Sequence, residues 1–415
     1  MSDSPVSKNP AKKRKRINVR KPDVMAKVEA EVEGHYKSSI VEKIRANGGS
    51  VTLGNTTIKL AKQFGFCYGV ERAIDLAYAS RKVFEDKNIY LIGEIIHNPE
   101  VNRQLSDMNI VSLPWEQMDE QYDALTDDDV VIVPAFGAPT HFVEKIEERG
   151  AGIVDTTCGD VMKVWRRVKT YAKQGFTSVI HGKAGHEETL ATASHALGVE
   201  KNGNYLIILT LADTDFVCDY IRGNVSDEVF MAKFGEKNVS PGFDPKLHMN
   251  QIGVANQTTM LKSETEEIQR RIQQAIVDRD SGVENFQVFD TICGATQERQ
   301  DALFEMLEDK MDILLVVGGY NSSNTTHLVE IGEEELPTFF IRNAECIDSL
   351  EQIVHYDLEK KEEIRSDYTS ILDKDAAVTV GITAGASCPN NLIEATVLRI
   401  CELRGIDKSQ MLELT

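Results

Sequence analysis

Three cysteines share one local pattern and together could bind a metal centre. Cys67 lies in "GFCYG", Cys158 in "DTTCGD" and Cys293 in "DTICGA". Each has a glycine within two residues, which lets the backbone approach a bulky group closely. A helical pattern follows each cysteine, so a thiolate there would lie at a helix amino terminus, where the dipole stabilises it. Three thiolates can hold a 4Fe–4S cluster and leave one iron open for substrate, whereas a fourth ligand would complete the cluster.

The repeated phrase D-T-x-C-G does not by itself require a metal. It could mark an internal duplication, a disulfide or a nucleophile, and any single cysteine is more often a small buried core residue. The seven cysteines are odd in number, widely spaced and without a C-x-x-C pair, which disfavours a disulfide framework and a zinc ribbon. Cys218, Cys346 and Cys401 lack a neighbouring glycine. Cys388 precedes Pro389 in a glycine-bearing loop and is a weaker fourth candidate.

Polar loops that follow short apolar runs form a second group. The segments "VVGGYNSSNTTH", "TAGAS" and "ANQTT" offer serine, asparagine and threonine, and "IIHNP" and "AGHEE" add His97 and His186. With backbone N–H groups, these side chains suit a phosphate or diphosphate, although a helix cap explains "NSSN" taken alone. Glu187 and Glu188 are both candidate proton carriers, and the residues themselves do not decide between them.

Strands that alternate with helices must position these groups. From about residue 57 to 400, short β-branched runs end in polar loops and helical patterns follow, which predicts an α/β fold with buried parallel strands. Ligands of such sheets bind beyond the carboxyl ends of the strands. The segment 23–47 has helical composition, and Gly48 and Gly49 could end that helix.

The composition limits the possible partners. The chain has 415 residues and a formal net charge of −20, so its body should repel nucleic acids and anionic membranes. The basic stretch "AKKRKRINVRKP" is most simply a solvated, disordered tail. No apolar run reaches the ~20 residues of a membrane-spanning helix, and no signal-peptide core is evident. We therefore expect a cytoplasmic bacterial protein, and a plastid location is less favoured because no transit peptide is evident.

The motifs together resemble the 4-hydroxy-3-methylbut-2-enyl diphosphate reductase (LytB) family. The supporting segments occur in the family's order over roughly residues 55–400: "GFCYGVERA", "EIIHNPEVN", "DTTCGDVMKVW", "GHEETLATA", "NQTTM", "DTICGATQERQ", "VVGGYNSSNTTHL" and "TAGAS". The sequences of these segments are most similar to those of the plant and cyanobacterial branch. The resemblance implies three similar α/β domains with mainly parallel sheets, in a pseudo-threefold arrangement around a central iron–sulfur site.

We place the domain bounds as follows: a basic tail at 1–22, an amino-terminal extension with the first strand at 23–66, three α/β domains at 67–157, 158–292 and 293–386, and a carboxyl-terminal segment that closes the site at 387–415.

The resemblance also implies roles for individual residues. Cys67, Cys158 and Cys293 would bind one 4Fe–4S cluster with one open iron. Glu188 aligns with the family's proton-relay glutamate, and Thr258 would support that relay by positioning the substrate oxygen or a water. The diphosphate would be bound by His97, His186, Ser322, Ser323, Asn324 and Ser387, with Thr258 also near the substrate.

The implied reaction is a two-electron reductive dehydroxylation that gives isopentenyl and dimethylallyl diphosphate, the last step of the methylerythritol phosphate route to isoprenoids. The sequence carries no flavin or nicotinamide motif, so ferredoxin or flavodoxin is the expected electron donor. The alternatives are another three-cysteine 4Fe–4S enzyme, such as a dehydratase or a quinolinate-synthase-like enzyme, and a non-catalytic iron–sulfur sensor. A metal-free cysteine hydrolase fits less well because it needs one thiol with a paired base.

One loop departs from the family's common pattern. Many members have a histidine in an "S-A-H-G" loop that contacts the diphosphate, whereas this chain reads "PAFGA" and has Phe136 there. Phenylalanine cannot donate a hydrogen bond, so that contact is absent. The plant-like branch shares the change, which indicates a variant pocket with its activity intact. The family needs no thiol beside Ser387, so Cys388 is expected to be a core residue.

Overall fold

Short apolar runs form the strands of three sheets, each with four or five strands. The structure is a computed structural model that describes residues 16–115, 118–289, 291–368 and 375–407. The strands β5 (Val130–Val133) and β11 (Ile313–Val317) are buried along their whole length, as expected where helices cover both faces of a parallel sheet. The predicted α/β class with mainly parallel sheets is confirmed.

The first sheet is wholly parallel, with the strand order β4-β3-β5-β6. Alternate residues of β5 enter two hydrophobic clusters, Val130 and Ile132 in one and Val131 and Val133 in the other, so both faces are packed. The other strands are β3 (Ile89–Ile92), β4 (Ile110–Leu113) and β6 (Gly152–Asp155). The helices of this lobe are α3 (Tyr68–Val83), α4 (Pro99–Asp107), α5 (Met118–Asp123) and α6 (Thr140–Arg149).

The second sheet repeats this design, with the order β10-β9-β7-β8 and parallel neighbours throughout. Its strands are β7 (Thr177–His181), β8 (Tyr205–Ile208), β9 (Ile252–Asn256) and β10 (Phe286–Val288). The helices of this part of the chain are α7 (Gly159–Gln174), α8 (Glu187–Ala196), α9 (Leu211–Ile221), α10 (Asp227–Phe234), α11 (Pro245–His248) and α12 (Lys262–Asp280).

The third sheet combines segments from both ends of the chain in the order β1-β2-β15-β11-β12. The hairpin of β1 (Ser50–Leu53) and β2 (Thr56–Leu60) is antiparallel, and β2 pairs in parallel with β15 (Val378–Ala384). The remaining elements of this lobe are β12 (Thr338–Ile341), the short helix η2 (Ala344–Cys346), the ribbon of β13 (Gln352–Asp357) and β14 (Glu362–Asp367), and the helices α13 (Gly294–Leu307), α14 (Ser323–Glu333) and α15 (Asn390–Leu403).

The amino-terminal segment differs from the single helix that its composition suggests. It forms α1 (Pro22–Tyr36) and α2 (Ser39–Ala46), because the Ser38 side chain accepts a hydrogen bond from the Val41 N–H and caps a new helix. The predicted tail lies partly outside the described residues. Where it is described, the Ile17 N–H donates to the Ile153 carbonyl and Val19 is buried, so this part of the predicted tail packs along the first sheet.

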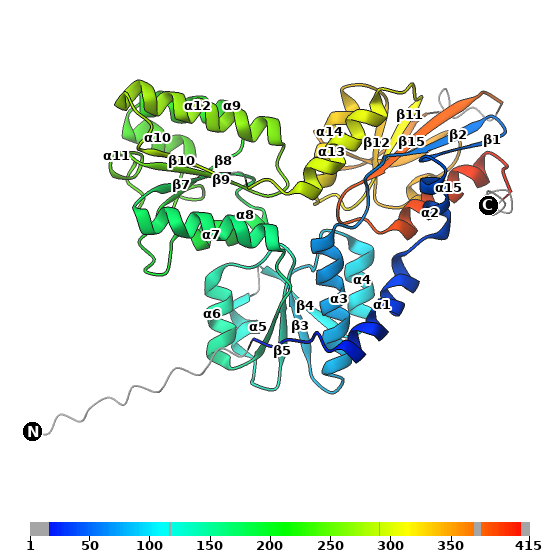
Figure 1. Cartoon of the computed structure of the whole chain (residues 1–415), viewed down its shortest axis with the longest axis horizontal. Helices are drawn as coiled ribbons and strands as arrows, with labels where there is room; N and C mark the ends of the chain where they lie inside the picture. Colours follow the sequence, from blue (N-terminus) through cyan, green and yellow to red (C-terminus); the bar gives the residue numbers. More distant parts are fainter. Residues whose placement is uncertain (1–15, 116–117, 290, 369–374, 408–415) are drawn as a thin grey trace, which may run out of the picture.

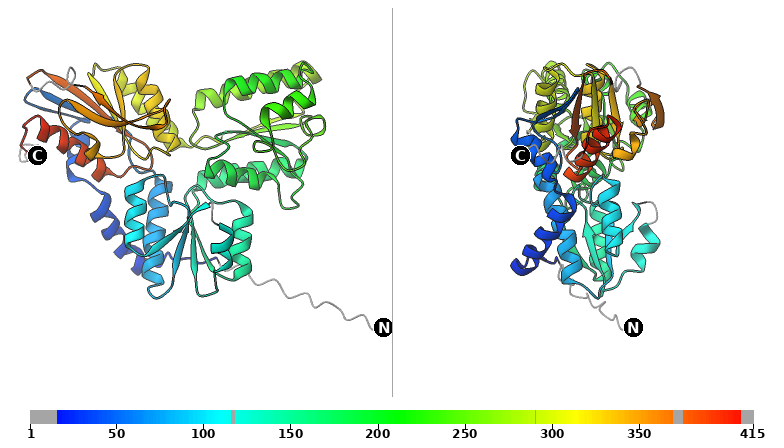
Figure 2. Two further views of the ribbon diagram at one scale, coloured as in Figure 1. Left: turned by 180° about the vertical axis from the view of Figure 1, so that it is seen from behind. Right: turned by 90° about the vertical axis from the view of Figure 1, so that its right-hand side faces the viewer.

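The three lobes surround a common centre (Figure 1), and the amino-terminal ends of α3, α7 and α13 point toward it. Helices α1 and α2 lie on the outside, where α1 contacts α3 and α15 and so connects the first lobe to the third (Figure 2). Within the described part of the chain, no helix is long and apolar enough to cross a membrane. The sheets thus bring strand ends from distant parts of the sequence to one place.

Candidate functional site

A cavity of about 110 Å³ lies where the three lobes meet. Its lining includes the three cysteines that share the glycine-flanked pattern and the polar residues that follow the strand ends. The predicted site residues that line it are Cys67, Cys158, Cys293, Glu188, Thr258, His97, His186, Ser322, Ser323, Asn324 and Ser387. The structure therefore brings together all the residues to which the family resemblance assigns a role, although the roles themselves stay predictions.

Each of the three cysteines is the residue that immediately precedes a helix. Cys67, Cys158 and Cys293 occupy the N-cap positions of α3, α7 and α13, all with extended backbone. Their side chains are therefore close to the first free N–H groups of each helix, which stabilise negative charge on sulfur. The same arrangement comes once from each lobe, which is the origin of the repeated sequence pattern.

The thiols converge closely. A Cβ atom added to Gly69 would lie 2.6 Å from the Cys158 Sγ and 3.8 Å from the Cys67 Sγ, so only glycine fits between these two thiols. The Cys293 Sγ lies 3.4 Å from the Asp160 Oδ2, in the first turn of the helix that Cys158 caps. The three sulfur atoms therefore face one region from three loops.

Burial keeps two of these thiols protonated in the free protein. It raises the pKa of Cys158, and it raises the pKa of Cys293 to about 12, against the opposing effect of nearby backbone N–H groups. A thiol with a raised pKa is a poor nucleophile, which disfavours the cysteine hydrolase alternative. A metal centre would release these protons, because the metal ligand is the thiolate.

The other four cysteines lie in packing environments. Cys388 is fully buried, its Sγ is near the carbonyl of Pro389, and burial raises its pKa. It belongs to the hydrophobic cluster of the third lobe together with Cys346 and Cys401. Cys218 is buried in the second lobe. None of the four lines the central cavity.

Glu188 carries the buried carboxyl group of the cavity. Its Oε1 accepts from the Thr258 N–H at 2.6 Å and its Oε2 accepts from the Thr258 hydroxyl at 3.0 Å. The side chain is almost completely buried, and this burial raises its pKa to about 7, against the lowering effect of the Thr258 hydrogen bonds. A carboxyl group with that pKa can give up a proton at neutral pH. Glu187 lies outside the cavity lining.

Buried donors surround the opposite part of the cavity. Ser322 caps α14, whose first residues are Ser323 and Asn324, so free N–H groups of this helix face the same region. The Asn324 Oδ1 accepts from the Ala386 N–H at 2.8 Å, whereas its Nδ2 is buried without a partner. The Ser387 hydroxyl donates to the His97 carbonyl at 3.1 Å. An unpaired buried donor is costly, so this part of the cavity is complementary to an anion.

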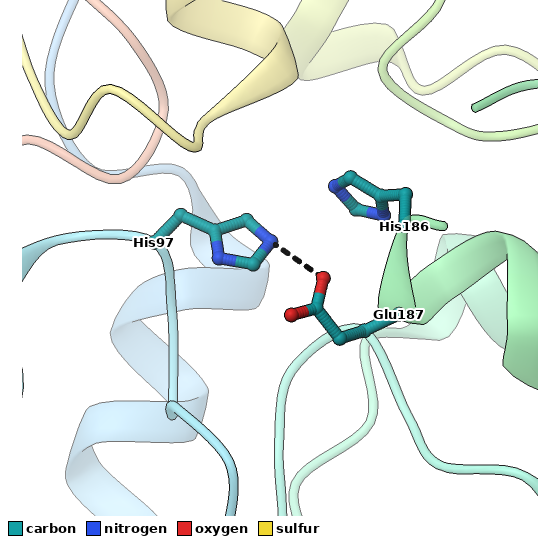
Figure 3. A group of neighbouring side chains, drawn as sticks. All are labelled: His97, His186 and Glu187. Atoms are coloured by element: carbon teal, nitrogen blue, oxygen red, sulfur yellow. Dashed lines mark ion pairs between the residues drawn. The ribbon is translucent and has the colours of Figure 1, made fainter. Parts of the chain in front are cut away.

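His97, His186 and Glu187 form a small cluster beside these donors (Figure 3), with one ligand atom from each within 4.8 Å of the others. Two imidazoles and a carboxylate are also a zinc ligand set. However, the His186 Nδ1 accepts from the Glu188 N–H at 3.1 Å, so the neutral ring carries its proton on Nε2. Burial lowers the pKa of His186 well below its usual value, so the neutral form prevails. Its unpartnered Nε2–H therefore suits an anionic oxygen better than a metal ion.

His97 is held by contacts that the sequence did not reveal. Its Nδ1 lies 3.1 Å from both the Glu94 Oε2 and the Asn321 Nδ2, and its ring stacks on Phe136 with 4.6 Å between centroids. Phe136 occupies the position at which many family members have the histidine of the "S-A-H-G" loop. Its ring does not donate a hydrogen bond, but it orients the His97 ring by stacking on it. Glu94 lies two residues after the end of β3, and this position near a strand end was the sequence signal that could have identified it.

Comparisons with known proteins show the family of the chain. A family model described as LytB protein matches residues 58–401. A protein of Thermosynechococcus vestitus named 4-hydroxy-3-methylbut-2-enyl diphosphate reductase is 44% identical over 383 residues, covering 91% of this chain and 92% of the relative. One of the same name from Synechococcus sp. (strain WH7803) is 46% identical over 380 residues, with coverage of 91% and 92%.

Two solved structures are also similar. The structure of (E)-4-hydroxy-3-methyl-but-2-enyl diphosphate reductase, described as the terminal enzyme of the non-mevalonate pathway, is 26% identical with a TM-score of 0.51, and the match covers 83% of this chain and 99% of that one. The second is the structure of the E-1-hydroxy-2-methyl-but-2-enyl-4-diphosphate reductase from Plasmodium falciparum. Its sequence is 21% identical, the TM-score is 0.58, and the match covers 82% of this chain and 86% of that one. At this identity, the similarity supports the fold alone.

Proposed function

The chain belongs to the LytB protein family, and on this premise we propose that it is a 4-hydroxy-3-methylbut-2-enyl diphosphate reductase. The observation that carries the proposal is the single cavity that joins three thiols, a buried carboxyl group and a set of unpaired donors. These three parts correspond to three requirements of a reductive dehydroxylation: a source of electrons, a proton for the leaving oxygen, and a binding site for the diphosphate.

The cysteines fit an iron–sulfur cluster. Cys67, Cys158 and Cys293 face one region from three helix amino termini, and Gly69 leaves space beside two of the sulfur atoms. When bound, a 4Fe–4S cluster with three protein ligands supplies electrons one at a time and an iron with an open coordination position. The three thiolates are the only protein ligands that this proposal needs.

The remaining residues act on the substrate. The overall reaction consumes two electrons and two protons, breaks the allylic C–O bond, forms a C–H bond and releases water. The Glu188 carboxyl group supplies a proton to the departing oxygen, and Thr258 fixes the orientation of that carboxyl through its N–H and hydroxyl. The buried position of Glu188 excludes water from this proton transfer.

The diphosphate occupies the donor-rich part of the cavity. The α14 amino terminus with Ser322, Ser323 and Asn324, the Ser387 hydroxyl and the two histidines supply hydrogen bonds to its oxygens. Ferredoxin or flavodoxin delivers the electrons in this proposal, since the sequence has no flavin or nicotinamide motif. A cytoplasmic location is part of the same proposal.

The direct test is anaerobic purification followed by iron analysis and an assay. We expect about four iron atoms per chain, a brown chromophore, and reduction of 4-hydroxy-3-methylbut-2-enyl diphosphate by a chemical donor such as a reduced viologen. A protein that binds no cluster after anaerobic reconstitution would contradict the proposal. A brown protein that leaves this substrate unchanged would point to a different three-cysteine iron–sulfur enzyme.

Asn324→Asp tests the diphosphate site with almost no change in shape. The Asp carboxylate can still accept from the Ala386 N–H, but it replaces the unpaired Nδ2 donor with negative charge. We expect the Kd for inorganic pyrophosphate, measured by calorimetry, to rise at least about tenfold, a loss of about 1.4 kcal/mol, with unchanged iron content. The exposed Asn250→Asp provides the same charge change away from the cavity. Equal affinity in both variants would exclude Asn324 from the diphosphate site.

A further inference from the structure

An arginine without a carboxylate partner is buried beside the cysteine loops. Arg299 lies on α13, six residues after Cys293, and only 3% of it is exposed. Its guanidinium donates through Nε and Nη2 to the Gly65 carbonyl, at 3.2 and 2.6 Å, and through Nη1 to the Ala295 carbonyl at 2.7 Å. All three contacts are to neutral carbonyl groups. Among the described residues, no carboxylate forms an ion pair with Arg299.

This arrangement leaves the guanidinium without a described carboxylate in direct contact. Burying a charged group is costly unless an opposite charge lies close to it. Burial lowers the pKa of Arg299, and the groups that most strongly oppose this effect are Cys67 and Cys293. Glu71 lines the same hollow as Arg299, but no hydrogen bond or ion pair joins these two described side chains. Burial raises the pKa of the Glu71 carboxyl group, and the charges of Lys37 and Arg299 oppose that effect.

The backbone contacts place the guanidinium between two of the cysteine loops. Gly65 precedes Cys67 by two residues, and Ala295 follows Cys293 by two residues. Gly65 has a positive φ of 81°, a conformation that few other residues adopt. One side chain therefore connects the Cys67 loop of the first lobe to the helix that Cys293 caps.

We propose that Arg299 is the counter-cation of the metal centre: its fixed charge offsets the negative charge of the thiolates and stabilises the reduced state of the cluster. This inference depends on the proposed function, because it needs a redox cluster on the three cysteines. One-electron reduction adds one negative charge to the cluster. A buried cation nearby favours that added charge, because the surrounding protein screens the attraction less than water does. Arg299 is thus a positioning residue that raises the reduction potential.

The experiment compares Arg299→Gln with Arg299→Lys in the anaerobically purified holoenzyme. Gln removes the charge and can keep one hydrogen bond, whereas Lys keeps the charge and loses the forked geometry. The reduction potential is measured by redox titration followed by electron paramagnetic resonance. We expect Arg299→Gln to shift the reduction equilibrium at least tenfold toward the oxidised cluster. For one electron, this tenfold shift makes the reduction potential about 59 mV more negative. Arg299→Lys should retain most of the wild-type potential. Arg270→Gln removes an exposed charge from α12 as the control.

The outcomes separate the two proposals. A wild-type protein that binds no cluster would overturn the proposed function, and this inference with it. If the wild-type protein binds a cluster and Arg299→Gln has the same reduction potential, the inference alone is overturned. If Arg299→Gln loses the cluster, retention of iron by Arg299→Lys supports the role of the charge. Loss of iron from both, with native circular dichroism, would show that the hydrogen bonds to Gly65 matter and the charge does not.

Discussion

Replacing Glu188 with glutamine is expected to lower turnover by about 10²- to 10⁴-fold, the range for loss of a positioned proton donor, while the protein keeps its iron. The variant preserves the shape of the side chain and one acceptor oxygen for the paired contacts from Thr258. It removes the proton that the buried carboxyl group holds near neutral pH. Turnover with a viologen donor and iron per chain are the two measurements.

The pH dependence follows from the same group. Because burial raises the pKa of Glu188 to about 7, the protonated fraction falls as the pH rises through that value. We expect kcat of the wild-type protein to decline as the pH rises above about 7. The pH profile of Glu188→Gln should lack this decline. A viologen donor suits this measurement because its potential does not vary with pH.

Glu187→Gln is the matched control, since it makes the same change at the adjacent residue. The Glu187 carboxylate lies 3.6 Å from the His97 Nε2 and outside the cavity lining, so its loss should leave the chemical step and its pH limb in place. Wild-type turnover in Glu188→Gln, or an equal loss in both variants, would refute the assignment of Glu188 as proton donor.

Substitution of any one of Cys67, Cys158 or Cys293 with alanine is expected to abolish the chromophore and reduce activity to background. The three thiols face one region from three lobes, and the two remaining thiolates cannot replace the missing third ligand. Iron per chain and visible absorption measure this directly. The fold should persist, because each lobe has its own hydrophobic clusters.

Cys388→Ala is the control for the cysteine variants. Cys388 follows Ser387 directly, yet its side chain is fully buried in the cluster of the third lobe. We expect this variant to keep its iron and its turnover and to lose only some thermal stability, because a small buried group is removed. Loss of iron from Cys388→Ala, or its retention in one of the other three variants, would show that the ligand set is different.

Local sequence features predicted which residues line the central cavity, because these residues lie in loops that follow strands. Cys158, Ser322 and Ser387 each come three to five residues after the end of a strand, so glycine, polar residues and a following helical pattern marked them. The parallel sheets and the α/β class followed from the same alternation. What the pattern could not supply was any contact between distant segments.

Three features show this limit. The pairing of β2 with β15 aligns Thr56 with Val378, and no local signal states which sheet a hairpin joins. The tautomer of His186 depends on the Glu188 N–H, which becomes visible only when the loop geometry is known. Arg299 lies in an ordinary helical pattern, and its charge matters only because the folded protein buries it.

The third sheet has a consequence for how the protein is made. Its strand β2 is synthesised early, yet it pairs with β15 near the carboxyl end, and the Cys67 N–H donates to the carbonyl of Ala386. A nascent chain can therefore close its first two sheets while it is still on the ribosome, but it cannot fix the Cys67 loop until residue 386 has emerged. Because domains fold as units during synthesis, the three-cysteine site is completed last. Under the proposed function, a chain that stops before residue 386 lacks the contact that holds the Cys67 loop of the cluster site.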